Sequence, residues 1–302
     1  MRLQHGPKAK WSRRAMIACS KNIDRMTTPM GDAAAILSAV GAVAGAAVDA
    51  RSSDAVAPAI DESELARRLA EYDFAEPRPL QGVVQDLVAL LRDFAVRSDH
   101  PRYFGLFNPP ALVPAIAGDL VAAAINPQLA VWAHAPSAAE IERKLIRLFG
   151  GFVWNDIEAA GTFTGGGSEA NATALVAALA RRYPDWDRAG LPRTGPRPAI
   201  YASSEAHLAW IKIARGCGLG SEAVRLVPSE DGLRMTGDAL SRVIAAEPDW
   251  EPVLVVATAG TTAHGAIDDL AGIAKVGRSC GAHVHVDAAW AGAALLDPRR
   301  RG

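Results

Sequence analysis

The stretch His283-Val-His-Val-Asp287-Ala-Ala-Trp290 is the most informative part of this 302-residue chain. It has the pattern of a short apolar strand that ends in a carboxylate followed by small residues. Because side chains alternate along a strand, we expect His283, His285 and Asp287 to share one face. A carboxylate at a strand end, beside small residues, suits a flat cationic ring lying against the backbone.

Upstream of this stretch, apolar runs alternate with helical patterns. Strand-like runs occupy residues 199–202, 224–227, 253–257 and 283–286, and helices are predicted over 168–182, 236–246 and 268–280. Strands alternating with helices of this length predict an α/β fold with a mostly parallel sheet. Ligands of such sheets bind at the carboxyl ends of the strands.

The N-terminal third is predicted to lie outside this sheet. Residues 1–29 carry seven Lys or Arg and one acid without apolar periodicity, so we interpret them as a basic, non-folding leader, with Met30 as an alternative start. Residues 30–100 are predicted to be a helical segment, which includes a capped helix after Asp61 and an apolar stripe over 80–96. The α/β domain is then expected over 101–302, with two further helices at 116–125 and 138–149.

Composition excludes several classes of function. Half of the residues are hydrophobic, and 32 Lys and Arg nearly balance 33 Asp and Glu, which argues against nucleic-acid or acidic-membrane partners. Residues 33–48 are uncharged but shorter than the roughly 20 apolar residues of a membrane span, and we interpret them as a buried or interface helix. The three cysteines fit no metal spacing and predict a reducing, cytoplasmic location.

A glycine-rich turn, Gly165-Gly-Gly-Ser168, precedes the predicted helix over 168–182. Glycines let a backbone approach a ligand closely, and the exposed N–H groups of a helix start favour a phosphate. Ser168 can cap the helix and donate to a phosphate oxygen. A plain turn before a capped helix is the alternative interpretation, because the spacing matches neither a nucleotide P-loop nor Gly-x-Gly-x-x-Gly.

Two further polar residues follow strands. His207 comes after the run 199–202 and either stacks on a planar ligand or caps a helix. Thr262 comes after the run 253–257, where a hydroxyl either binds a ligand or forms a local turn. Asp268 is predicted to cap the helix that follows.

Three interpretations compete for His283, His285 and Asp287. The histidines can simply pack in a strand. The His-x-His-x-Asp pattern also resembles the metal motif of metallo-β-lactamase-type hydrolases, but Ala288 stands where that motif requires a histidine. In the third interpretation, Asp287 pairs with a protonated pyridine nitrogen. Taken in chain order, the four motifs fit one ligand: a phosphate grip, a ring stack, a hydroxyl contact and a ring-nitrogen acid.

With these motifs the chain resembles the group II pyridoxal-phosphate-dependent amino acid decarboxylases, which include aromatic-L-amino-acid, glutamate and diaminobutyrate decarboxylases. The resemblance implies the aspartate-aminotransferase fold, fold type I, and covers about residues 65–298. Its most specific segments are His100-Pro-Arg-Tyr-Phe-Gly, Trp132-Ala-His-Ala-Pro-Ser, Gly165-Gly-Gly-Ser-Glu-Ala-Asn, His207, Gly260-Thr-Thr262 and His285-Val-Asp-Ala-Ala-Trp-Ala-Gly.

The resemblance implies that residues of all four motifs bind pyridoxal 5'-phosphate: Gly167, Ser168, His207, Thr262, Asp287 and Ala289. Gly167 and Ser168 would hold the phosphate, and Asp287 would pair with the pyridine nitrogen. His207 would stack on the ring and act as the catalytic residue in the protonation step. Thr262 would lie near the cofactor, and Ala289 would pack on the other face of the ring.

The loop Leu106-Phe-Asn-Pro109 would line the substrate pocket, with Phe107 and Pro109 as substrate-binding residues. Aromatic decarboxylases tend to carry a tyrosine and a threonine where Leu106 and Pro109 stand, which disfavours an aromatic substrate. The implied reaction is decarboxylation of an L-amino acid to an amine by a cytoplasmic homodimer. An aminotransferase of the same fold is the alternative enzyme.

The family attaches its cofactor to a lysine that follows a histidine, some tens of residues after the aspartate. No lysine follows Lys275 in this sequence. We therefore expect a chain that is truncated at its C-terminus, with an incomplete sheet and no activity of its own. A non-catalytic subunit that binds an intact partner is the remaining alternative.

Overall fold

The structure is a computed structural model that describes residues 34, 37–42, 45, 55–72, 78–105, 111–154, 158–192, 194–229 and 233–300. The predicted leader over 1–29 and the loop of Phe107 and Pro109 lie outside these residues. The chain divides into two compact units, residues 1–124 and 125–302. The boundary between domains that we predicted at residue 101 is a different kind of division from these compact units, and it stays a prediction. No helix in the described part is long and apolar enough to cross a membrane.

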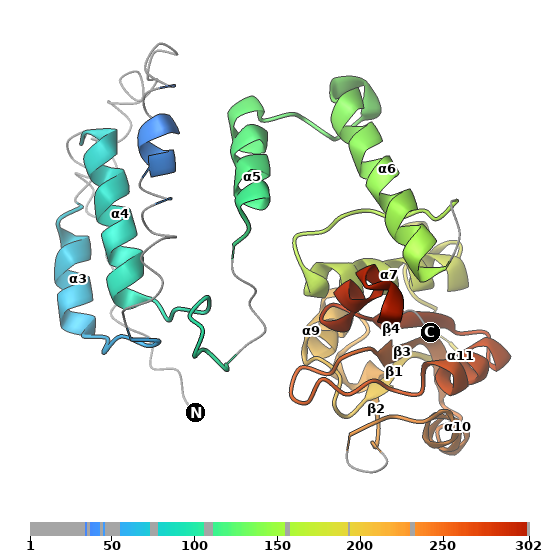
Figure 1. The fold of residues 1–302 in the computed structure, drawn as a ribbon. Coiled ribbons are helices and arrows are strands. Elements are labelled where there is room, and N and C mark those ends of the chain that lie inside the picture. Colours follow the sequence, from blue (N-terminus) through green and yellow to red (C-terminus); the bar gives the residue numbers. More distant parts are fainter. Residues whose placement is uncertain are drawn as a thin grey trace. The chain divides into compact units, whose positions relative to one another are not determined.

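The first unit is helical, with α3 (Glu62–Ala70), α4 (Leu80–Phe94) and most of α5 (Val113–Ile125). The carboxylate of Asp61 accepts hydrogen bonds from the first turn of α3, which confirms the predicted cap. Arg68 on α3 pairs with Asp93 on α4 at 2.9 Å, so these two helices lie side by side (Figure 1).

The second unit contains a parallel four-stranded sheet in the order β2-β1-β3-β4. Its strands are β1 (Arg197–Ser203), β2 (Val224–Val227), β3 (Trp250–Thr258) and β4 (His283–Asp287). All four predicted strands are therefore confirmed. The helices of this unit are α6 (Pro136–Val153), α7 (Gly167–Arg182), α8 (Trp186–Ala189), α9 (Ala209–Gly216), α10 (Gly237–Ala246) and α11 (Leu270–Ser279).

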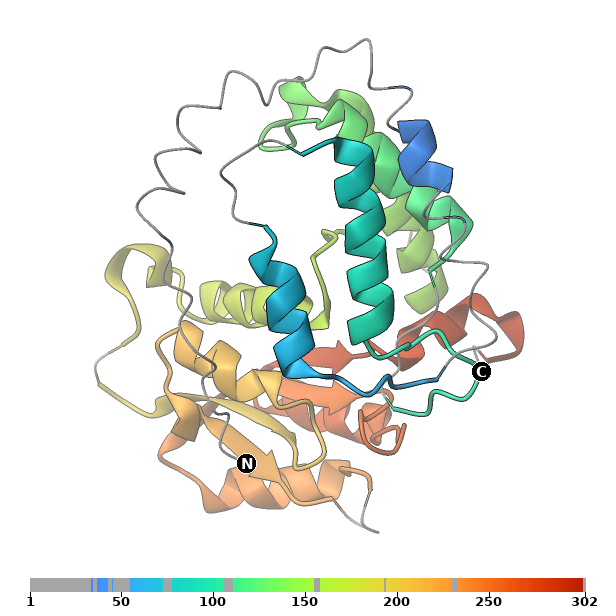
Figure 2. The same cartoon turned by 90° about the vertical axis from the view of Figure 1, so that its left-hand side faces the viewer.

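Helices cover both faces of the sheet (Figures 1 and 2). On one face, Ile200 and Leu254 pack with side chains of α7 and α9, including Leu175 and Trp210. Alternate residues of the same strands, such as Tyr201, point to the other face, where α10 and α11 pack. This alternation follows from the two-residue period of a strand. Because the helices pack on the two faces of the sheet, the ends of the strands are left free for a site.

Short 3₁₀ turns complete the unit: Trp132–His134 before α6, Ser221–Ala223 before β2, and Ala291–Leu296 and Pro298–Arg300 after β4. Two predicted caps are wrong. Gly166, not Ser168, is the N-cap of α7, because the extended glycine backbone starts the helix one residue earlier. Asp269, not Asp268, caps α11 by accepting from the N–H of Gly272.

Candidate functional site

The predicted site residues follow the carboxyl ends of three neighbouring strands. His207 lies four residues after the end of β1, Thr262 four residues after the end of β3, and Asp287 is the last residue of β4. Because β1, β3 and β4 are parallel neighbours, these ends meet at one edge of the sheet. This is the edge at which α/β proteins bind ligands.

Asp287 is buried, with 8% of its surface exposed. One carboxylate oxygen, Oδ2, accepts a hydrogen bond from Asn171 Nδ2 at 2.8 Å, and the other, Oδ1, accepts from the backbone N–H of Ala289 at 3.2 Å. An ionised carboxylate offers about four lone-pair positions. Two therefore remain for a further donor.

The glycine loop forms the N-terminus of α7 without a capping side chain. The N–H of Gly165 is bound by Glu169 Oε2 at 2.7 Å. Within the described part of the chain, the N–H groups of Gly166, Gly167 and Ser168 have no acceptor. Such orphan donors at the positive end of a 16-residue helix favour an anion.

The glycine loop also contacts the segment after β4. A Cβ atom built on Gly167 would lie 3.0 Å from the Cβ of Ala289, so the two backbones approach as closely as a glycine allows. The structure therefore brings together three of the predicted positions: Gly167 and Ala289 touch, and Ala289 donates to Asp287.

His207 is exposed in the loop before α9. Its Nδ1 accepts a hydrogen bond from the N–H of Ala209 at 3.1 Å. A neutral ring in this position must carry its proton on Nε2. The structure thus fixes the tautomer of His207, while no contact in the described residues joins its ring to Asp287 or Gly167.

Thr262 is exposed, whereas its neighbour Thr261 is fully buried and accepts from the N–H of Ala266 through Oγ1 at 3.1 Å. The loop packs against the segment after β4 at Gly260, which has a φ of +96° and faces the ring of Trp290. Thr261 therefore holds the loop, whereas Thr262 is accessible from solvent.

Sequence reasoning assigned no role to Asn171, which contacts Asp287 directly, and it did not predict that His285 would reach Asp287 through Asn171. Asn171 is buried on α7 and lies between Asp287 and His285, whose Nε2 is 2.8 Å from Asn171 Oδ1. Burial lowers the pKa of His285, which the charge of Asp287 partly opposes. One signal was available, because Asn171 follows Gly167 by four residues and so lies on the same helix face.

A second pair joins two of the strand-end loops. His264 Nε2, in the loop of Thr262, lies 3.7 Å from Glu205 Oε2, in the loop of His207. Both side chains retain solvent access, so the pair contributes little to stability. The pair does show that the loop of His207 and the loop of Thr262 lie next to each other.

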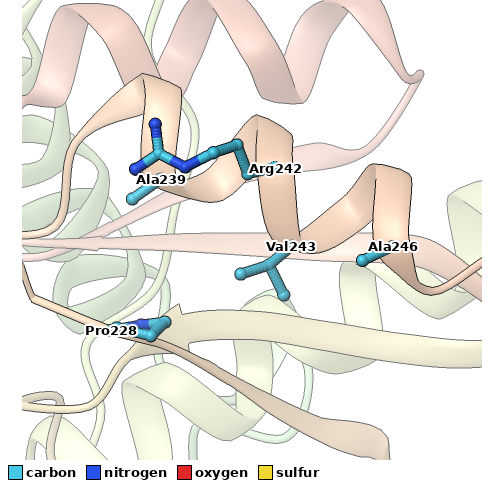
Figure 3. A pocket seen from close by; sticks show the side chains of 5 residues that line it. All are labelled: Pro228, Ala239, Arg242, Val243 and Ala246. Carbon is cyan, nitrogen blue, oxygen red and sulfur yellow. The ribbon is translucent and has the colours of Figure 1, made fainter.

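Other features do not coincide with the site. The hollow between α10 and the residue after β2 has a volume of about 210 Å³ and is lined by none of the predicted site residues (Figure 3). Its lining residues are Pro228, Ala239, Arg242, Val243 and Ala246. Across the described ranges, no group of three or more His, Cys, Asp or Glu side chains is arranged to hold a metal ion.

Comparison with known proteins gives one consistent result. Residues 64–302 match the family described as "Pyridoxal-dependent decarboxylase conserved domain". Mouse cysteine sulfinic acid decarboxylase is 36% identical over 211 residues, which are 69% of this chain and 42% of that protein. An L-2,4-diaminobutyrate decarboxylase of Rhizobium meliloti is 34% identical over 203 residues, 67% of this chain and 39% of that protein.

Solved structures agree. The glutamate decarboxylase domain of a diaminobutyrate-pyruvate transaminase and L-2,4-diaminobutyrate decarboxylase from Vibrio parahaemolyticus superposes with a TM-score of 0.81 at 30% identity, covering 91% of this chain and 61% of that one. The apo form of mouse cysteine sulfinic acid decarboxylase gives 0.80 at 29% identity, covering 90% and 58%. The chain therefore spans about two fifths to three fifths of the length of these relatives.

Proposed function

Because the chain belongs to the pyridoxal-dependent decarboxylase family, we propose that it binds pyridoxal 5'-phosphate and serves the decarboxylation of an L-amino acid to an amine. Membership in a decarboxylase family favours this reaction over the aminotransferase alternative. The observation that carries the proposal is the buried carboxylate of Asp287, which retains free acceptor positions at the ligand-binding edge of the sheet.

The residues present fit this cofactor. The free N–H groups of Gly166, Gly167 and Ser168 suit its phosphate. Asp287 suits a protonated ring nitrogen, since a charged donor compensates a carboxylate withdrawn from water. Gly167 lies so close to Ala289 that a side chain at Gly167 would crowd the segment that follows Asp287.

Each residue then has a defined task. When bound, pyridoxal 5'-phosphate supplies the electron sink for the electron pair that remains on Cα after carbon dioxide leaves. Asp287 would favour the protonated form of the ring nitrogen. His207 would stack on the ring and act in the protonation step through Nε2, because its Nδ1 accepts from the N–H of Ala209. Thr262 would contribute a hydroxyl, and Ala289 would pack on the other ring face.

A binding experiment tests the proposal. We expect pyridoxal phosphate to quench the tryptophan fluorescence of the purified full chain. Asp287→Asn should weaken this binding about tenfold or more, because a hydrogen bond to a charged group contributes about 1.5–3 kcal/mol. The control is Asp238→Asn, an exposed aspartate in the first turn of α10. Equal affinity of the two variants would contradict the role of Asp287.

The names of two relatives refer to cysteine sulfinic acid and to L-2,4-diaminobutyrate, an acidic and a basic amino acid. Phe107 and Pro109 remain our candidates for the residues that choose between such side chains. Exchange of the 106–110 loop between this chain and a relative of known substrate should transfer the substrate preference, measured as carbon dioxide release from a complete enzyme.

We further propose that the polypeptide of residues 1–302 does not decarboxylate amino acids by itself. Its six lysines include none after Lys275. Borohydride treatment with pyridoxal phosphate should therefore leave no adduct at a specific lysine in a peptide map. Release of carbon dioxide from purified chain supplied with cysteine sulfinate, glutamate or diaminobutyrate would contradict this part.

A cytoplasmic homodimer also belongs to the proposal. Helix α5 exposes large apolar side chains, with Val113, Val121 and Ile125 at 72%, 57% and 70% exposure. Burial of such side chains in a second copy would be favourable. Light scattering should give twice the chain mass of 31.7 kDa, and Val121→Glu should lower it to one mass.

A further inference from the structure

A chain of three polar side chains, of which Asn171 and Asp287 are buried and His285 is partly buried, links α7 to β4. Asn171, 4% exposed, places its amide between Asp287 Oδ2 and His285 Nε2, with both heavy-atom distances at 2.8 Å. The ring of Trp210 covers His285 edge-on, with 5.6 Å between the ring centroids. Because the amide is buried, each of its two ends needs a partner, and each has one.

Chemistry fixes the direction of these hydrogen bonds. An ionised carboxylate only accepts, so Asn171 must present its NH₂ group to Asp287 and its carbonyl oxygen to His285. His285 must then donate from Nε2. Burial, together with the nearby His283, lowers the pKa of His285 against the opposing effect of Asp287. At neutral pH His285 is therefore uncharged, with its proton on Nε2 and none on Nδ1.

The chain of hydrogen bonds can orient a carboxylate but cannot carry a proton. A primary amide does not titrate in water, so no proton passes through Asn171 from His285 to Asp287. What the amide does supply is a donor of fixed direction, strengthened by the donor behind it. Asn171 and neutral His285 carry no charge, so neither competes with a protonated ring nitrogen for the carboxylate of Asp287.

We infer that Asn171 is a positioning residue, held in one orientation by His285, that keeps the carboxylate of Asp287 turned toward a protonated ring nitrogen. The inference rests on the proposed function, because it presumes that Asp287 receives such a nitrogen. It adds that the strength of this pairing is set on α7, through a residue whose amide bonds Asp287 and His285.

The test must separate this role from simple packing of α7 against β4. We compare two ligands on the full chain: pyridoxal phosphate, and its 1-deaza analogue, in which a carbon replaces the ring nitrogen. Both present the same phosphate and the same ring outline. Asn171→Leu removes both hydrogen bonds at similar volume. Thr173→Val is the control, since Thr173 is exposed on the same helix and only bonds the carbonyl of Glu169.

We expect wild type to prefer pyridoxal phosphate over the analogue, and Asn171→Leu to lose about tenfold in affinity for pyridoxal phosphate alone. Thr173→Val should keep the wild-type ratio. Equal losses for both ligands in Asn171→Leu, or no loss, would overturn the inference while leaving the proposed function intact. A wild-type chain that binds neither ligand, or both equally, would refute the proposed function and the inference with it.

A second measurement is made on the wild-type chain and uses a variant only to assign one signal. Nitrogen-15 NMR of the histidine rings in the wild-type chain reports the tautomer directly. We expect His285, identified by its loss in His285→Gln, to be neutral and protonated on Nε2 at pH 7. A ring protonated on Nδ1, or on both nitrogens, would overturn the proposed direction of the hydrogen bonds.

Discussion

Gly167 and Ala289 pack against each other across 122 residues of sequence, at the contact between the start of α7 and the segment after β4. A Cβ on Gly167 would lie 3.0 Å from that of Ala289, so one of the two segments would have to shift. The pair therefore sets the distance between the proposed phosphate and ring positions.

This contact predicts that Gly167→Ala weakens binding of pyridoxal phosphate by about 1 kcal/mol, the lower range for overpacking. Gly167→Ala/Ala289→Gly should recover most of the loss, because the second change removes the contacting methyl group. Fluorescence titration of the four proteins closes a double-mutant cycle. Additive effects in the cycle would mean that the two positions do not act through their contact.

The two strand histidines predict how stability depends on pH. Burial lowers the pKa of both His283 and His285 below the ordinary 6.5. The unfolded chain then binds more protons than the folded chain near pH 6, so the stabilisation is present above pH 6.5 and lost as the pH falls through the folded pKa values.

We therefore expect the free energy of unfolding, from urea denaturation, to decrease as the pH is lowered from 7.5 to 5.5. His285→Gln should flatten this dependence, because glutamine can still donate to Asn171 but does not titrate. His134→Gln, at an exposed histidine, should leave the slope as it is in wild type. A pH-independent stability of wild type over this range would contradict the prediction.

Local patterns predicted most of the fold. The apolar run 224–227 coincides with β2, and the capping pattern at Asp61 placed the start of α3. Helix α9 was missed, because its eight residues follow Leu208, which supplies no side-chain cap to mark the start. Its buried residues Trp210 and Ile213 show a helical spacing that is too short to identify by periodicity alone.

The site was predictable in its residues but not in its contacts. The alternation rule correctly placed His285 and Asp287 on one face, since both reach Asn171. The contact itself joins residues 114 and 116 positions apart, and no local pattern encodes such a distance. We predicted Asp268 as the helix cap instead of Asp269 for the same reason. The burial of Asp268 depends on the fold, and no local pattern shows it.

The hydrogen bonds of Asp268 predict that this residue contributes more to stability than its neighbour Asp269. Its two oxygens accept from the N–H groups of Met235 and Thr258, both at 2.8 Å, and burial raises its pKa. Asp268→Asn would turn an NH₂ group toward one of these donors. We expect a loss of about 1–3 kcal/mol in unfolding free energy at pH 7. Asp269→Asn should cost less, because asparagine caps helices as well as aspartate and the second bond of Asp269, from the N–H of Gly237, is long at 3.4 Å. Equal costs would contradict this assignment.

The close packing of Gly260 against Trp290 predicts that this contact fixes the conformation of the loop after β3. Gly260 has a φ of +96°, and a Cβ there would lie 2.5 Å from the indole Cε3 of Trp290. Gly281 has a φ of +75° with nothing within 4 Å of such a Cβ. Gly281→Ala should therefore cost only the backbone term of about 1–2 kcal/mol, whereas Gly260→Ala adds an overpacking term of about 1–3 kcal/mol. The comparison by urea denaturation isolates the indole contact. Similar costs at both glycines would show that Trp290 moves aside freely and does not fix the loop that carries Thr262.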